Sequence, residues 1–226
     1  IALDGAVVED DNFPNLLLDI ALLRSLSIRV VLVHGAAHQV RRYAELMGLT
    51  PSDVDGTGIT DRDTLNVAIT AATRVTHEIL EGLTANDLRA ACPNAVVAHP
   101  AGILGGVDHL LTGRVERVDT ELLQTLLERD IVPVVPPIGI DGAGASYRLN
   151  SDAVAVELAK SLRAVKLVYL NTEGGVRDAR GVVRQMTAGE AEAFLKRSKA
   201  ELPSGAVTKA CGPCSPLPPS SANNWT

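Results

Sequence analysis

The chain has 226 residues, of which 46% are hydrophobic and 21% are charged, with a formal net charge of −6. This composition excludes wholesale disorder, a collagen and a coiled coil, and the negative charge argues against a non-specific nucleic-acid binder. No apolar run reaches the roughly 18 residues that a membrane span needs, and the length suffices for one sizeable domain.

The first part of the chain predicts a βαβ unit. We expect a strand over residues 1–8, then a helix over about 12–26, where apolar residues recur at helical spacing. A second strand is expected over 28–33, because an unbroken β-branched and aliphatic run is typical of a strand buried on both faces. A short loop, His34-Gly35-Ala36-Ala37, follows this strand, and a helix is expected to begin near His38.

Helices and strands continue to alternate along the rest of the chain. In order, the pattern predicts a helix over 63–91 broken near Gly82, a strand over 96–98, a hairpin over 107–118 turning at Thr112-Gly113, a helix over 119–128, a buried strand over 131–135 and a flexible turn over 139–145. It then predicts a helix from the Asn150-Ser151-Asp152 cap to about 162, a buried strand over 165–170, a hairpin over 176–186, a helix over 187–196 opened by a Thr187–Glu190 capping box, and a short helix over 204–210. The fold class is therefore α/β with a mainly parallel sheet.

The last residues differ in composition from the rest. Residues 211–226 hold four of the twelve prolines and no charged residue, so we expect a domain over 1–210 followed by a disordered tail. Cys211-Gly212-Pro213-Cys214 matches a redox tetrapeptide, but the proline-rich sequence after it cannot form the required helix. Three cysteines in this length do not make a disulfide scaffold, and without a visible signal peptide we expect a cytoplasmic protein.

Glycines at the ends of predicted strands are the main functional signal. Gly5, Gly35 and Gly174-Gly175 each follow a strand, where ligands of open α/β sheets bind. Glycine lets backbone N–H groups approach an anion, so these loops are candidates for holding a phosphate or carboxylate. The alternative is that short connections in α/β folds need glycine anyway.

Asp152 and Lys209 are the charged candidates. An aspartate beside Asn150 at a helix start can orient a lysine across a site, and that lysine can neutralise developing phosphate charge. The alternatives are a helix-start carboxylate stabilised by the helix dipole and a solvated surface lysine.

Several other chemistries find no motif in the chain. The GxGxxG, GxxxxGK[ST] and GxSxG patterns are absent, as is a pyrophosphate loop for acetyl-CoA of the Gln/Arg-x-x-Gly-x-Gly/Ala type. The five histidines are scattered without metal-ligand spacing, so no metal site is expected. Aromatic residues make up only 3%, which provides no stacking platform for bases.

In combination, several segments resemble the amino-acid kinase family, within it the N-acetylglutamate kinase and synthase branch. The resemblance runs from Ile1 to about Cys211 and is carried by the joint order of five stretches: I-A-L-D-G-A to V-L-V-H-G-A, G-I-T-D-R-D-T-L, G-V-D-H-L-L-T-G-R-V-E-R-V-D to P-P-I-G-I, L-N-S-D-A-V-A-V-E-L-A-K-S-L, and S-G-A-V-T-K-A-C. It implies a three-layer αβα sandwich in which ligands lie over the carboxyl ends of the strands.

The resemblance also implies roles for individual residues. In the kinase, one lysine in the first strand–loop motif and a second near the C-terminal end stabilise the transferring phosphoryl group, and an aspartate organises them. Lys209 matches the second lysine, Asp152 matches the aspartate, and Asn150 belongs to the same motif. The first lysine corresponds to Ala2, with Asp4 close behind it, which removes a transition-state cation and adds an anion.

Three further positions depart from the kinase pattern. The second glycine loop carries Ala36 and Ala37, the substrate-binding arginine corresponds to Gly58, and the aspartate after the late strand corresponds to Thr172. Kinase activity is therefore not expected, and Ala2, Asp152 and Lys209 are interpreted as a degenerate kinase site. Gly5, Gly35, Asn150, Asp152 and Lys209 remain candidates for ligand binding.

The wording of the segments is more similar to the synthase, in which this domain binds arginine and mediates oligomerisation while a separate acetyltransferase domain catalyses. We therefore expect a regulatory domain acting in arginine biosynthesis, truncated or frame-shifted before an acetyltransferase domain. Its ligand would be arginine or N-acetylglutamate, it would form a homo-oligomer in the full-length protein, and acetyl-CoA would belong to the parent synthase. The alternatives are an active N-acetylglutamate kinase using Mg-ATP and a free-standing amino-acid-binding scaffold.

Overall fold

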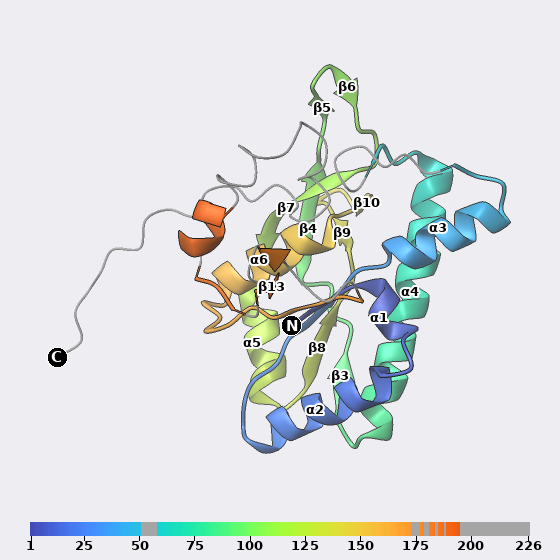
Figure 1. Cartoon of the computed structure of the whole chain (residues 1–226). Coiled ribbons are helices and arrows are strands. Elements are labelled where there is room, and N and C mark those ends of the chain that lie inside the picture. The colour runs from blue at the N-terminus through green and yellow to red at the C-terminus, as the bar shows by residue number, and fades with distance from the viewer. Residues whose placement is uncertain (51–57, 173–176, 179–180, 184, 188, 195–226) are drawn as a thin grey trace.

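The computed structural model describes residues 1–50, 58–172, 177–178, 181–183, 185–187 and 189–194 (Figure 1). The helices are α1 (Gly5–Val8), α2 (Phe13–Ser25), α3 (Ala37–Leu46), α4 (Arg62–Ala85), α5 (Thr120–Glu128) and α6 (Ser151–Ser161). Residues 189–194 are also helical. The predicted helices over 12–26, 119–128 and 150–162 are confirmed by α2, α5 and α6. The predicted capping box is also present, since the Thr187 N–H donates to Glu190 Oε2 at 2.7 Å.

The central sheet is entirely parallel, as predicted. Its strand order is β11-β1-β2-β8-β3, formed by Tyr169–Leu170, Ala2–Leu3, Leu32–His34, Val132–Val135 and Ala90–Ala91. A second, mixed sheet has the order β10-β9-β4-β7, formed by Ser146–Arg148, Ile138–Ile140, Val96–Pro100 and Gly113–Val118. Two hairpins complete the described strands, β5 (Ile103–Leu104) with β6 (Val107–Asp108) and β12 (Arg177–Asp178) with β13 (Gly181–Val182).

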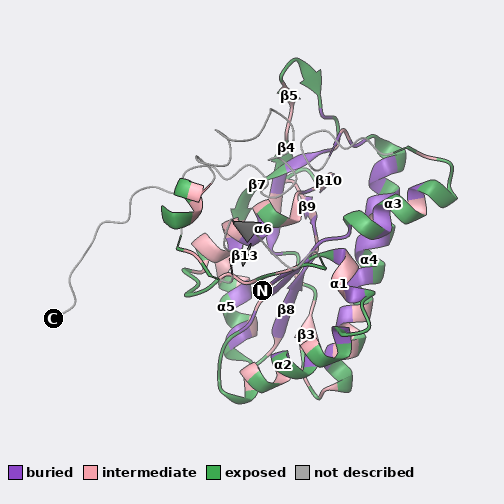
Figure 2. Cartoon of the chain, viewed as in Figure 1, coloured by how far each residue is buried: buried purple, intermediate pink, exposed green. Residues whose placement is uncertain are grey.

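Helices cover both faces of the parallel sheet, so the layers are αβα (Figure 1). Because side chains alternate along a strand, each central strand supplies residues to two separate cores. One core, with α2, α3 and α4, contains Leu3, Leu32 and Val134. The other, with α5 and α6, contains Ala2, Val33 and Val135. Figure 2 shows the buried residues concentrated in β8 and along the inner side of α4.

The long helix differs from its prediction. α4 begins at Arg62, ends at Ala85 and continues through Gly82, while Ala90–Ala91 forms a strand. The glycine serves packing instead of a break, because a β carbon at Gly82 would collide with the Leu17 side chain of α2. A glycine inside a helical pattern therefore marked a close helix–helix contact.

The predicted hairpin over 107–118 is wrong. Val107–Asp108 forms an antiparallel pair with the preceding strand, Ile103–Leu104. Gly113–Val118 forms an antiparallel pair with β4 instead. The turn lies at Gly105 and Gly106, whose φ values of 56° and 83° fall in the left-handed region that glycine adopts without a steric penalty. The turn therefore forms at these glycines and not at Thr112-Gly113.

Three strand predictions were too long, and one turn was misplaced. The first strand ends at Leu3, and Gly5 starts α1 instead of ending a strand. The run over 28–33 yields Leu32–His34, with Ile28 exposed, and the run over 165–170 yields a two-residue strand with Val165 fully exposed. Gly139 lies within β9 and not in the predicted turn. A β carbon added at this position would lie 2.7 Å from Ala98 Cβ, which explains why glycine occupies it.

Four of the predictions concern residues outside the described ranges, namely the short helix over 204–210, the Pro-rich tail, Lys209 and Gly174-Gly175. Within the described residues, no helix is long and apolar enough to cross a membrane.

Candidate functional site

Two loops at the carboxyl edge of the parallel sheet form the centre of the candidate site. β1 and β2 are adjacent and in register, with Leu3 opposite His34, so the segments that follow them start side by side. The Gly35 N–H donates to Leu3 O at 2.7 Å. A β carbon on Gly5 would lie 3.0 Å from Gly35 O and 3.2 Å from Ala36 Cα. The structure therefore brings Gly5 and Gly35 together as predicted, and the close approach explains why glycine occupies position 5.

The start of α6 completes this edge. Asn150 is the N-cap of α6, and its Oδ1 accepts the Ala153 N–H at 3.0 Å. The Ser151 hydroxyl lies 3.3 Å from the point that a β carbon on Gly35 would occupy. The structure thus places three of the predicted ligand-binding residues, Gly5, Gly35 and Asn150, at one edge of the sheet.

A cavity of about 50 Å³ lies between the second glycine loop and α6. It is lined by Ala36, Ala37, Val40, Ala68, Pro137, Ile138, Arg148, Leu149, Asn150 and Ser151. Small-molecule sites in proteins usually measure about 300–1,000 Å³, so this space is narrow. Ala36 and Ala37, which depart from the kinase pattern of the second glycine loop, are among its lining residues.

Two carboxylates interact electrostatically at the site. Burial raises the pKa of the Asp152 carboxyl, and the negative charge of Asp4 raises it further. Asp4 is also the N-cap of α1, where its Oδ1 accepts the Ala6 N–H at 3.4 Å. The repulsion felt by ionised Asp152 makes this part of the edge unfavourable for another anion.

Ala2 has no functional group at the position that the resemblance assigns to a lysine. It lies in β1, is buried, and packs in the core shared with α5 and α6. Gly58 accepts the Thr112 hydroxyl on its carbonyl at 2.7 Å, and Thr172 is exposed beyond β11. None of these three residues supplies a charge to the described site.

His34 is a site residue whose environment sequence reasoning missed. It is fully buried, with Nδ1 3.1 Å from Gly35 O and Nε2 2.8 Å from Thr76 Oγ1. The carbonyl can only accept, so Nδ1 carries the proton of the neutral ring, and Nε2 competes for the single Thr76 hydroxyl proton with Ala72 O, which also lies 2.8 Å from Oγ1. Burial lowers the pKa of His34 to about 4, partly opposed by the bond to Gly35, so the ring is neutral near pH 7.

Gln39 is the second residue that sequence reasoning missed. It lies in the first turn of α3, is buried, and its Nε2 donates to Gly5 O at 2.9 Å and to Glu9 Oε1 at 3.1 Å. Glu9 in turn pairs with Arg42 at 3.1 Å. Gln39 therefore fastens the first glycine loop to the helix that follows the second one.

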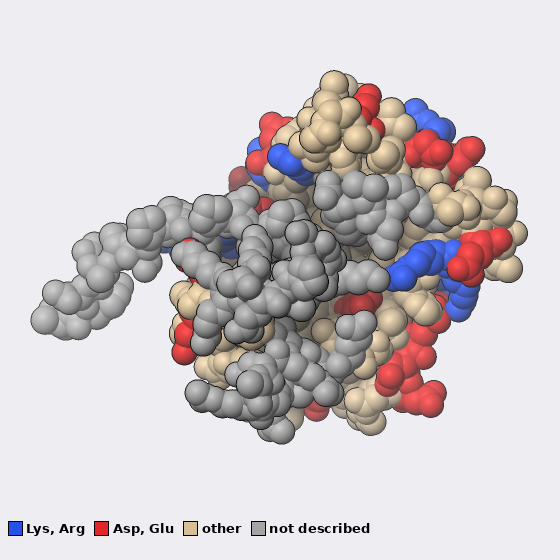
Figure 3. Space-filling view, turned by 45° about the horizontal axis from the view of Figure 1, so that its top comes forward, with Lys and Arg blue, Asp and Glu red and all other residues tan. Residues whose placement is uncertain are grey.

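Charge clusters and metal-ligand groups give no further signal among the described residues. On the face shown in Figure 3, Lys and Arg side chains are mixed with Asp and Glu, and the described residues there form no broad positive patch. Within the described ranges, no group of three or more His, Cys, Asp or Glu side chains is placed to hold a metal ion. Neither observation therefore points to a nucleic-acid interface or a metal centre within the described ranges.

Comparison with known proteins agrees with the fold. The model of the amino acid kinase family matches residues 1–209. An amino-acid acetyltransferase of Vibrio cholerae is 31% identical over 211 residues, covering 89% of this chain and 47% of the relative. An amino-acid acetyltransferase of Pseudomonas fluorescens Pf-5 is 35% identical over 207 residues, covering 87% of this chain and 48% of the relative. The chain thus spans about half the length of these curated relatives.

Solved structures of N-acetylglutamate synthase share the fold of this chain. N-acetylglutamate synthase from Neisseria gonorrhoeae, complexed with coenzyme A and N-acetyl-glutamate, superimposes with a TM-score of 0.81 at 30% identity. The match covers 92% of this chain and 48% of that one. The same enzyme complexed with coenzyme A and L-arginine gives a TM-score of 0.80 at 28% identity, over 92% of this chain and 50% of that one.

Proposed function

The chain belongs to the amino acid kinase family, and on that premise we propose that it is a kinase-like regulatory domain of the N-acetylglutamate synthase type. In this proposal the domain binds an amino acid at the carboxyl edge of its parallel sheet and transfers no phosphate. The whole protein would oligomerise and act in arginine biosynthesis, and the chemistry of acetyl-CoA would not involve the residues of this chain.

The charge of the candidate site carries the proposal. Phosphoryl transfer depends almost wholly on positioning and on stabilising negative charge. Here Ala2 provides no cation, and Asp4 and Asp152 place two carboxylates close enough for Asp4 to raise the Asp152 pKa. Losing one transition-state donor costs about 3–4 kcal/mol, even before the added anion is counted.

The same charges suit a cationic amino acid. A carboxylate pair is stabilised by an ammonium or guanidinium group, and arginine carries both. The structure of the Neisseria gonorrhoeae enzyme with L-arginine supports this choice. Within the proposal, Asp152 contacts the cationic end of the ligand, and Gly5, Gly35 and Asn150 lie around its remainder. Lys209, which is outside the described residues, stays a candidate from the sequence.

Thermal unfolding with and without arginine tests the proposal. Arginine at about 100 times its dissociation constant should add about 2.7 kcal/mol to the free energy of unfolding, which is a rise in Tm of roughly 5–10 °C for a chain of this size. Citrulline has nearly the same shape without the positive charge, and it should produce no comparable shift. An unchanged Tm with arginine, or an equal shift with citrulline, contradicts the proposal.

The Asp152→Asn variant tests the proposed contact between Asp152 and the ligand. It removes the charge that Asp4 repels, so the ligand-free variant should melt at a higher temperature than the original chain. It should also lose most of the arginine-induced shift, because the cationic end has lost its partner. A variant that is stabilised by arginine as strongly as the original chain would remove Asp152 from the site.

A further inference from the structure

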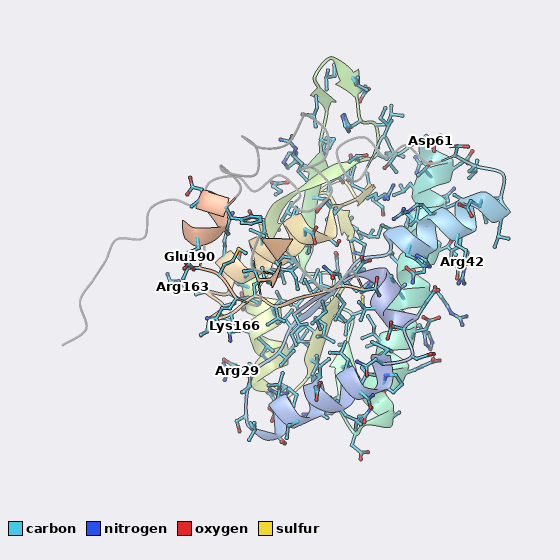
Figure 4. All side chains as sticks on the ribbon, viewed as in Figure 1. Arg29, Arg42, Asp61, Arg163, Lys166 and Glu190 are labelled. Atoms are coloured by element: carbon cyan, nitrogen blue, oxygen red, sulfur yellow. The ribbon has the colours of Figure 1, made fainter. Side chains whose placement is uncertain are left out.

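A larger cavity lies away from the glycine loops, at the N-terminal end of α4. Its volume is about 430 Å³, within the range of small-molecule sites and equal to roughly 14 waters at about 30 Å³ each. Figure 4 labels Asp61, which precedes α4 and marks this end of the helix. The lining residues are Arg62, Leu65, Asn66, Ile69, Leu111, Ala143, Gly144, Ala145 and Ser146. They come from α4, from the segment before β7, and from the turn between β9 and β10.

The lining combines one cation with aliphatic surface. Among the described lining residues, Arg62 is the only charged one, and none carries a carboxylate. Leu65, Ile69 and Leu111 provide apolar side chains, and Asn66 provides a hydrogen-bonding amide. A mostly apolar concavity with a few placed polar groups is the usual composition of a ligand site. The sign of the charge selects an anion, and the aliphatic residues select an apolar body.

The position of Arg62 adds a second, electrostatic argument. Arg62 is the first residue of α4, where the helix dipole disfavours positive charge. It forms no ion pair with another described residue. The adjacent acids do not line the cavity, and Asp61 is engaged as the N-cap through the Thr64 N–H at 2.8 Å. The arginine thus does not stabilise the free helix, whereas a bound anion would give its guanidinium a partner that the described residues do not provide.

We propose that this cavity binds a small carboxylate with an aliphatic body, with Arg62 holding the carboxylate and Leu65, Ile69 and Leu111 contacting the chain. This site shares no lining residue with the cavity at the glycine loops. It is therefore separate from the amino-acid site proposed above, and either one can fail without the other.

A two-dimensional NMR titration of the whole chain with hexanoate tests this site, with hexylamine and hexanol as probes of matched length. Hexanoate should cause saturable shifts at the backbone amides of Leu65, Asn66 and Ile69, while hexylamine should cause none and hexanol should bind more weakly. Arg62→Gln should weaken hexanoate at least tenfold. Arg41→Gln, which removes an exposed arginine of α3, should leave it unchanged.

Stability separates lost binding from lost folding. Because Arg62 is unfavourably placed at the helix start, Arg62→Gln should keep or slightly raise the Tm of the free chain. Absent saturation, or equal hexanoate affinity in Arg62→Gln and the original chain, overturns the proposal. A concentration-dependent dimer that dissociates on Arg62→Gln also overturns it, since a second copy would then cover this face.

Discussion

A Gly5→Ala variant is expected to lose about 1–3 kcal/mol of unfolding free energy, the usual cost of overpacking an ordered interior. The added methyl group would meet Gln39 Oε1 and two backbone atoms, Gly35 O at 3.0 Å and Ala36 Cα at 3.2 Å. The side chain can move away, but the backbone of the second loop cannot move without losing the Gly35 N–H bond to Leu3 O. The variant should therefore also weaken ligand binding at the carboxyl edge.

Chemical denaturation measures this effect, with Gly142→Ala as the matched control. A β carbon on Gly142 would meet no atom within 4 Å, so that variant should change stability by less than about 1 kcal/mol. In a Gln39→Ala background, Gly5→Ala should cost less, since one of its three close neighbours is gone. Equal effects of the Gly5 and Gly142 substitutions would contradict the close approach of the two loops.

Acid should destabilise the chain through His34 by about 3 kcal/mol. The pKa of this buried histidine is about 4, against 6.5 for the free side chain, and each unit corresponds to about 1.36 kcal/mol. A base whose folded pKa is lowered binds protons more readily in the unfolded chain. Its contribution is therefore fully present above about pH 6.5 and is lost as the pH falls towards 4.

Unfolding free energies measured between pH 7 and pH 4 test this, in the original chain and in His34→Asn. The asparagine amide keeps a donor near the Gly35 carbonyl but does not titrate. The variant should be less stable at pH 7 and should lose stability less steeply on acidification. His77→Gln, which replaces an exposed histidine of α4 paired with Glu81 at 3.1 Å, serves as the comparison substitution. A constant difference between the original chain and His34→Asn across this range would contradict the assignment.

The sequence predicted the helices better than the strands, for a physical reason. A helix closes its hydrogen bonds within itself, so apolar spacing and the Asn150 cap located α6 almost to the residue. The ends of a strand depend on where its partner ends. The apolar run from Ile28 forms a strand only from Leu32 onward, where Leu32 lies opposite Val134 of β8 and Val33 lies opposite Ala2 of β1. Pairing of this kind is not visible in local sequence.

Glycines and buried polar residues were ambiguous for a related reason. Gly144 lies in a turn with φ of 85°, whereas Gly139 lies in a strand under Ala98, and the sequence around them does not separate these roles. His34 bonds Thr76, 42 positions away, and Gln39 bonds Gly5, 34 positions away. The strand-end loops were therefore predictable, but the side chains that hold them in place were not.

The central claim is that this amino acid kinase fold binds a ligand at the carboxyl edge of its parallel sheet but transfers no phosphate. The most direct measurement is a coupled ADP-release assay of the whole chain with N-acetylglutamate and Mg-ATP. We predict no ADP release above that of ATP without the protein, because Ala2 and the Asp4–Asp152 pair leave the transferring phosphate unstabilised. Turnover that depends on N-acetylglutamate and disappears in Lys209→Ala would contradict the account and identify the chain as a kinase.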